Sequence, residues 1–135
     1  MWICGNMNFD FKKYYNVGTH LKDYSSKEEY QRSSISRYYY SVYHPVKDYY
    51  EKSFRKILSS QDSHSKLIKE LENSPFEEEN KLGEDMRILR NYRNEADYDK
   101  KELGKTKLKN TKNKTDKILL QLDKLIKNPL RLMRR

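Results

Sequence analysis

The stretch ISRYYYSVYHPVKDYYEKSFRKIL, residues 35–58, carries apolar side chains at helical rather than alternating intervals. Positions that recur every three or four residues fall on one stripe of a helix, which can pack along its whole length against neighbouring helices. The stretch therefore predicts one long helix within an all-α protein. The apolar members of the stripe are Ile35, Tyr39, Val42, Val46, Tyr49, Tyr50, Phe54, Ile57 and Leu58.

The segments on either side of this stretch also have helical patterns, and serine, glycine and proline stand at their boundaries. Serines before acidic residues are typical of a helix start, and a proline is typical of a position just outside a helix. The expected elements are a first helix at 9–22, the long helix from Ser25-Ser26, a short helix between a loop at 59–63 and Pro75, a fourth helix after Pro75, and a last helix, frayed at its start, between Gly104 and Pro129.

The composition suits a single domain with an aromatic interior. Hydrophobic residues make up 35% of the 135 residues, and 12 tyrosines are among them. A tyrosine carries a polar hydroxyl on an apolar ring, so it suits half-buried faces and interfaces better than a dry core. We therefore expect the protein to associate with itself. Met7 as well as Met1 is a candidate start, which makes residues 1–6 a candidate extension outside the fold.

The cysteine and histidine content excludes several kinds of site. Cys4 is the single cysteine, so an internal disulfide or a thiolate cluster is excluded. His20, His44 and His64 lack the close spacing of metal ligands, and we expect no metal and no cofactor. No apolar run approaches the roughly 18 residues of a transmembrane helix, and the first residues lack a signal-peptide pattern. We therefore expect a cytoplasmic protein without membrane contact.

The net charge of +9 is concentrated near the C-terminus. Residues 1–99 contain 16 Lys and Arg against 17 Asp and Glu, whereas residues 100–135 contain 13 against 3. A basic surface of this kind attracts phosphate backbones, acidic partners or anionic membranes. The alternative interpretation is a solvated helix face that is merely rich in lysine.

The sequence RNYRNEADYD, residues 90–99, has a composition suited to binding phosphate. In a helix, Arg90, Arg93, Asn94 and Asp97 fall on neighbouring stripes, so planar guanidinium donors and an amide converge. Arg93 also lies in line with the apolar face of the helix, so we expect it to be shielded from solvent. The alternative role for Arg93 and Asp97, at i and i+4, is an ion pair that fixes helix packing.

A second motif, RYYYSVYH at residues 37–44, lies in the long helix. It places Arg37, Tyr40, Ser41 and His44 at i, i+3, i+4 and i+7, along one helical face. A face with an arginine, a tyrosine and a histidine combines groups that hold phosphate with a group that moves protons.

Three ordered matches, SRYYYSVYH, the isolated histidine of SHSKLIKEL, and LRNYRNEADYD, give the chain a resemblance to the HEPN superfamily and especially to its stand-alone branch. The resemblance covers most of the chain and implies a HEPN-like domain at 7–128 with a basic tail at 129–135. It implies an up-and-down bundle of four to five helices that dimerises through the long helices. RNA would be the ligand, and a cognate antitoxin or a defence-system protein would be the partner.

The resemblance also implies roles for individual residues. Active members of the superfamily are metal-independent ribonucleases in which a histidine follows the motif arginine by about four to six positions, but this chain has no histidine after His64. His44 is then the candidate base beside an arginine clamp. The candidate catalytic residues are Arg90, Arg93, Asn94, Asp97 and His44. The candidate RNA-binding residues are Arg37, Tyr40, Asn91, Tyr98, Lys112, Lys114 and Lys117.

Two functions remain open from the sequence. The first is a ribonuclease that acts as a toxin or an antiviral defence effector, and the second is a non-catalytic module that binds RNA or a partner protein. The plain structural interpretations also remain open: His64 beside Ser63 as a residue that starts a helix, and Tyr39 as part of the core.

Overall fold

The protein is an all-α bundle. The computed structural model describes residues 8–59 and 61–128, so the candidate extension at 1–6 and the basic tail at 129–135 lie outside the described residues. Within the described part of the chain there is no strand. The elements are the 3-10 helix η2 (Phe11–Lys13) and the α-helices α1 (Tyr14–Tyr24), α2 (Glu28–Phe54), α3 (Ser63–Glu72), α4 (Glu77–Tyr98) and α5 (Lys105–Lys127).

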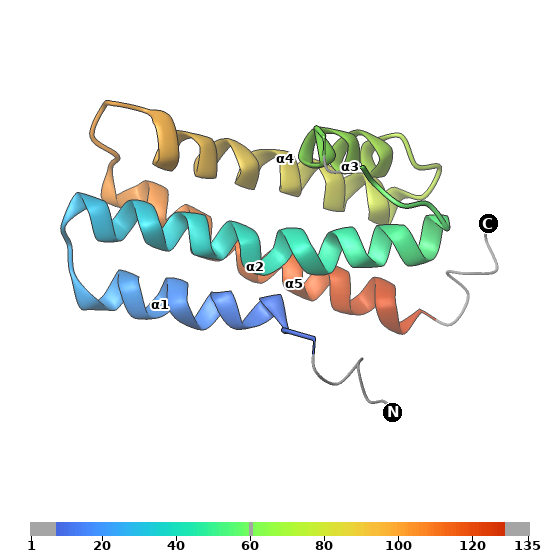
Figure 1. Ribbon diagram of the computed structural model, residues 1–135, viewed down its shortest axis with the longest axis horizontal. Helices are drawn as coiled ribbons and strands as arrows, with labels where there is room; N and C mark the ends of the chain where they lie inside the picture. Colours follow the sequence, from blue (N-terminus) through green and yellow to red (C-terminus); the bar gives the residue numbers. More distant parts are fainter. Residues whose placement is uncertain (1–7, 60, 129–135) are drawn as a thin grey trace.

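The long helix α2 is the centre of the bundle. Figure 1 shows α1 along one side of α2, α4 with α3 along the other, and α5 behind it. The short helix α3 packs mainly on α4. Most of the apolar stripe predicted from residues 35–58 is buried, which confirms a long helix at the centre of the fold. The helix ends earlier than expected, at Phe54, because Arg55 adopts a left-handed conformation, so Ile57 and Leu58 lie outside it. The buried apolar side chains of α2 are Ile35, Tyr38, Tyr39, Val42, Tyr43, Val46, Tyr49 and Tyr50.

The starts of the first and last helices also differ from the sequence expectation. The first helical segment starts as η2, capped by the Asp10 carboxylate, which accepts the Lys12 backbone N–H at 3.0 Å. The last helix is regular from Lys105 rather than frayed. Its first half is fixed because Thr111 and Thr115 are fully buried. Their hydroxyls donate to carbonyl oxygens one turn earlier, each at 2.8 Å.

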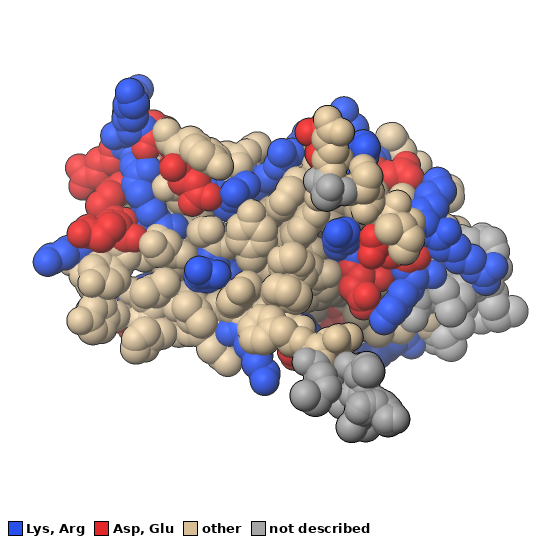
Figure 2. All heavy atoms as spheres, viewed as in Figure 1, with Lys and Arg blue, Asp and Glu red and all other residues tan. Residues whose placement is uncertain are grey.

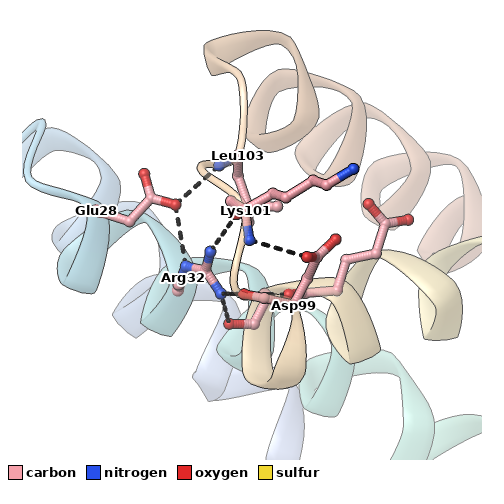
Figure 3. A network of polar contacts seen from close by, with 7 residues as sticks. Glu28, Arg32, Asp99, Lys101 and Leu103 are labelled. Atoms are coloured by element: carbon pink, nitrogen blue, oxygen red, sulfur yellow. Dashed lines mark hydrogen bonds and ion pairs between the residues drawn. The ribbon is translucent and has the colours of Figure 1, made fainter.

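The C-terminal end of α4 is closed by Arg32 of α2 (Figure 3). A helix leaves its last carbonyls unpaired, and α4 has no basic residue in its own last turn. Nε of Arg32 donates to Glu28 at 3.0 Å, and the same carboxylate oxygen accepts the Leu103 backbone N–H at 2.9 Å. The remaining nitrogens of Arg32 donate to the carbonyl oxygens of Glu95, Ala96, Asp99 and Lys101 at 3.3, 3.0, 2.6 and 2.7 Å.

None of the helices in the described ranges has both the length and the apolar character that crossing a membrane requires.

Candidate functional site

The start of α3 is attached to the middle of α2 by polar and aromatic contacts. The Tyr39 hydroxyl oxygen lies 2.5 Å from Nδ1 of His64. The His64 ring also stacks on Tyr43, with 3.9 Å between the ring centres. The Tyr43 hydroxyl is in turn 2.6 Å from the Ser63 hydroxyl. His64 is therefore a positioned side chain and not only the residue that starts α3.

Arg93 of α4 lies among three tyrosine rings. Its guanidinium carbon is 5.8, 5.3 and 5.9 Å from the ring centres of Tyr39, Tyr40 and Tyr98. Its side chain is 16% exposed, which confirms the expectation that it is shielded. Nε donates to Asp97 at 2.9 Å, so the ion pair suggested by the i and i+4 spacing is present. This arrangement combines cation–π attraction with a salt bridge.

Arg90 differs from Arg93 in its hydrogen bonding. Its Nε is buried and has no hydrogen-bond partner among the described residues. Arg93 is better satisfied, because its Nη1 also donates to the Asn94 side-chain oxygen at 3.3 Å. A buried donor without an acceptor costs free energy, and a guanidinium donor is matched by an anionic oxygen. Arg90 thus carries a donor for which an anionic oxygen would be a matching acceptor.

Burial and the two arginines together keep His64 uncharged. Burial, followed by the positive charges of Arg90 and Arg93, lowers the pKa of His64 to about 4. Burial raises the pKa of the Tyr39 hydroxyl above its ordinary value. At neutral pH the histidine is therefore an uncharged imidazole, and Tyr39 is a protonated phenol hydrogen-bonded to it.

We define the arginine–histidine cluster as Tyr39, Tyr40, His64, Arg90 and Arg93. It combines two guanidinium groups, a neutral imidazole and tyrosine hydroxyls, contributed by α2, α3 and α4. Such a set can hold a phosphate oxygen and exchange a proton with a neighbouring hydroxyl. In the described ranges, histidine, cysteine, aspartate and glutamate form no group of three placed to hold a metal ion.

His44 and Arg37, two further site candidates on α2, make their closest aromatic contacts toward the N-terminal segment. The His44 ring stacks on Phe11, with 3.8 Å between the ring centres. The Arg37 guanidinium lies over the Tyr14 ring at 4.8 Å. Burial and the nearby Lys47 lower the pKa of His44. Its ring is still 5.8 Å from that of Tyr40, so His44 borders the cluster without bonding to His64.

The three candidate lysines of α5 are each paired with a carboxylate. Lys114 and Lys117 reach the buried carboxylate of Asp85 at 3.0 and 3.3 Å. Burial opposes ionisation of Asp85, but the two ammonium groups outweigh it and hold its pKa below the ordinary value. Lys112 pairs with Asp116 at 3.1 Å and lies over the Tyr15 ring. These lysines tie α5 to α4 and to its own next turn.

Asn91 and Tyr98, the remaining candidates of the RNYRNEADYD motif, are both exposed on α4. Tyr98 is 74% exposed although it lies beside Arg93. The motif therefore presents one aromatic side chain to solvent at the edge of the arginine–histidine cluster.

Sequence reasoning gave His64 and Tyr39 only structural roles and assigned the base to His44. The feature of the sequence that could have indicated the role of His64 was the isolated histidine in SHSKLIKEL. Its meaning depends on the packing of α3 across α2, which no local pattern specifies. Comparison of the chain with known protein families, with curated proteins and with solved structures found no match.

Proposed function

We propose that the protein binds RNA at the arginine–histidine cluster and cleaves it without a metal ion. The observation that carries the proposal is the buried Nε of Arg90, which has no partner among the described residues and whose charge acts on the neutral His64. An unpaired guanidinium donor beside a neutral imidazole suits a phosphodiester next to a ribose 2′-hydroxyl. The HEPN resemblance of the sequence points to the same ligand.

In the proposed reaction each group of the cluster has one role. Arg90 and Arg93 hold the non-bridging phosphate oxygens, and their charge stabilises the transition state. In the tautomer whose Nδ1–H donates to the Tyr39 hydroxyl oxygen, Nε2 of His64 carries the lone pair and takes the proton from the 2′-hydroxyl. The 2′-oxygen then bonds to phosphorus, and the bond from phosphorus to the 5′-oxygen breaks. That oxygen takes a proton from a water molecule, and the resulting hydroxide takes the proton from His64. The products are a 2′,3′-cyclic phosphate and a 5′-hydroxyl end.

The low pKa of His64 supports a second candidate function. A base with a pKa of about 4 accepts a proton weakly at neutral pH. A protein with this histidine can bind RNA without cleaving it and act as an adaptor or a regulator. Phosphate binding is common to both candidates, and cleavage separates them.

We also propose that two copies of the chain pair through α1 and α2. Support comes from exposed apolar side chains in the N-terminal segment: Phe9 and Val17 are 51 and 41% exposed. Figure 2 shows that charged side chains gather toward the two ends of this face, while its middle is largely uncharged. A surface of this kind is typical of an interface between proteins. A role as a toxin or defence effector, with an antitoxin or a defence-system partner, rests on the sequence resemblance.

The test of the proposed reaction is cleavage of end-labelled RNA by the purified protein in EDTA. Wild type should give products that end in a 2′,3′-cyclic phosphate. The cleavage rates of His64→Gln and Arg90→Gln should be at least about tenfold lower than that of wild type. His44→Gln is the matched control, because His44 stacks on Phe11 outside the cluster and its loss should leave most of the activity.

The outcomes separate the two candidate functions. If the wild-type protein binds RNA but does not cleave it, the proposal of a ribonuclease is wrong and the non-catalytic binding module is supported. Full activity in both His64→Gln and Arg90→Gln, with folding confirmed by circular dichroism, would remove the cluster from the reaction.

A further inference from the structure

Tyr98 is an exposed aromatic residue next to a cationic site. It is the last residue of α4, its side chain is 74% exposed, and its ring centre is 5.9 Å from the Arg93 guanidinium carbon. Most of the ring lies in water beside a guanidinium group, so it contributes little to the packing of the bundle. The exposed ring can stack on a planar group that belongs to the same ligand as a phosphate.

The backbone that carries Tyr98 is fixed. Arg32 donates to the carbonyl oxygens of Ala96 and Asp99, the residues on either side of the last turn, at 3.0 and 2.6 Å. The Asp99 N–H closes that turn by donating to the Glu95 carbonyl at 2.9 Å. Ala96 is 3% exposed, so the turn also packs on the core. The ring is therefore presented from a rigid platform rather than from a frayed helix end.

The arginine beside the ring is fixed as well. Arg93 is held by Asp97 at 2.9 Å and by Asn94 at 3.3 Å, and it lies over the ring of Tyr40. Because these contacts keep the guanidinium in place, a phosphate bound at Arg93 would stand at a defined position relative to Tyr98. That relation matches a nucleotide, which has a flat base attached to a phosphate through one sugar.

We infer that Tyr98 stacks on an unpaired nucleobase next to the phosphate held by Arg90 and Arg93, so that the substrate is single-stranded RNA. This inference rests on the proposed function, because it takes the arginine–histidine cluster as the phosphate site. Bases in a duplex have their faces covered by neighbouring pairs, whereas unpaired bases offer a face to an aromatic side chain. Stacking of this kind accepts any base, so the inference concerns strandedness rather than sequence.

The chain offers a matched control for Tyr98. Tyr24 is 66% exposed and also lies at the end of a helix. Its described ring contacts are with His20 and Tyr30, and no arginine or lysine stacks on it in the described part of the chain. If exposed aromatic area alone determined RNA binding, Tyr24 and Tyr98 would contribute alike.

The test measures binding by fluorescence anisotropy. The probes are an eight-nucleotide single-stranded RNA with 2′-fluoro sugars, which prevent cleavage, and a blunt duplex of the same sequence. Wild type should bind the single strand at least about tenfold more tightly than the duplex. Tyr98→Ala should weaken single-strand binding by about five- to hundredfold, as expected for one lost base stack. Tyr98→Phe and Tyr24→Ala should leave it within about twofold.

A second readout reports the stack itself. With 2-aminopurine in the strand, wild type should quench the base fluorescence in at least one position, and Tyr98→Ala should not. If Tyr98→Ala binds as wild type does while Arg90→Gln binds more weakly, the stacking inference is wrong and the phosphate site stands. Equal affinity of wild type for strand and duplex also overturns it.

The remaining outcomes separate this inference from the proposed reaction. Binding that depends on Tyr98 without any cleavage of natural RNA leaves the stacking inference supported and contradicts only the reaction. A wild-type protein that binds neither the single strand nor the duplex overturns both.

Discussion

The hydroxyl oxygen of Tyr39 lies 2.5 Å from Nδ1 of His64, and this contact joins the middle of α2 to the start of α3. Tyr39 is fully buried, so its ring cannot rotate away from the histidine. The same histidine is kept uncharged by burial and by two arginines of α4. One hydrogen bond therefore positions the side chain on which the proposed chemistry depends.

Replacing Tyr39 with phenylalanine should destabilise the protein and slow the proposed reaction. The substitution keeps the ring but leaves Nδ1 of His64 without its partner, at a cost of about 1–3 kcal/mol in the free energy of unfolding. Urea unfolding measures this change. Tyr24→Phe, at an exposed ring, should stay within about 0.5 kcal/mol. Equal stability of the two variants would show that the Tyr39 hydroxyl bond contributes nothing.

Stability should fall as the pH decreases through the range in which an unfolded histidine takes up a proton. His64 has a pKa of about 4 in the folded protein against the ordinary value of 6.5. Between pH 4 and pH 6.5 the histidine is protonated in the unfolded chain but not in the folded protein. The contribution of His64 to the free energy of unfolding is therefore fully present above pH 6.5 and is lost as the pH falls toward 4. His44, whose pKa is also lowered, acts in the same direction.

The measurement is the free energy of unfolding from pH 8 to pH 5 for wild type, His64→Gln and His20→Gln. The loss of stability should be clearly smaller in His64→Gln, whereas His20→Gln, at an exposed position, should follow wild type. Parallel curves for wild type and His64→Gln would contradict the lowered pKa.

Arg32→Ala should lower the free energy of unfolding more than most substitutions of half-buried polar residues do. The side chain is 20% exposed, and its guanidinium donates to Glu28 and to four carbonyls, two in the last turn of α4 and two in the loop that follows it. Removing it should cost about 2–4 kcal/mol in the free energy of unfolding. Arg32→Lys should restore little, because an ammonium lacks the planar fork that reaches several acceptors.

Arg87→Ala is the control for Arg32. Arg87 pairs with Glu72, but its side chain is 50% exposed, so its loss should cost at most about 1 kcal/mol. If chemical denaturation gave equal losses for the two arginines, the closure of α4 by Arg32 would not be a main source of stability.

Gly83 and Gly104 should differ in how far an added methyl group destabilises the protein. A Cβ at Gly83 would lie 2.9 Å from the backbone nitrogen of Glu72, where α4 packs on α3. Gly83→Ala should therefore destabilise the protein by at least about 1 kcal/mol despite the gain in helix propensity. A Cβ at Gly104 meets nothing within 4 Å, and Gly104→Ala should change the melting temperature little. Equal shifts would contradict the close packing of α3 on α4.

The sequence predicted the fold class and the order of the helices because both depend on local periodicity and boundary residues. The apolar stripe that starts at Ile35 indicated α2, although its last members, Ile57 and Leu58, lie beyond the end of that helix. The alignment of Arg93 with an apolar face correctly indicated its shielding. These are properties of a single helix. They follow from 3.6 residues per turn without knowledge of any neighbour.

The composition of the candidate site depends on packing between helices and was predicted only in part. The bond between Tyr39 and His64 spans 25 residues, and the attraction of Lys114 to Asp85 spans 29. Local spacing placed His44 on a promising face but did not reveal that Phe11 stacks on it. The basic excess of the last quarter likewise did not reveal that Lys114 and Lys117 would be paired with a buried carboxylate.

The titration of His64 followed by NMR, with and without the uncleavable single strand, tests the arginine–histidine cluster most directly. In the free protein the Hε1 resonance should titrate with a pKa of about 4. With the strand bound, the pKa should rise, because a phosphate between Arg90 and Arg93 offsets the charges that lower it. A pKa near the ordinary histidine value in the free protein, or one that the bound strand leaves unchanged, would contradict a phosphate site at this cluster.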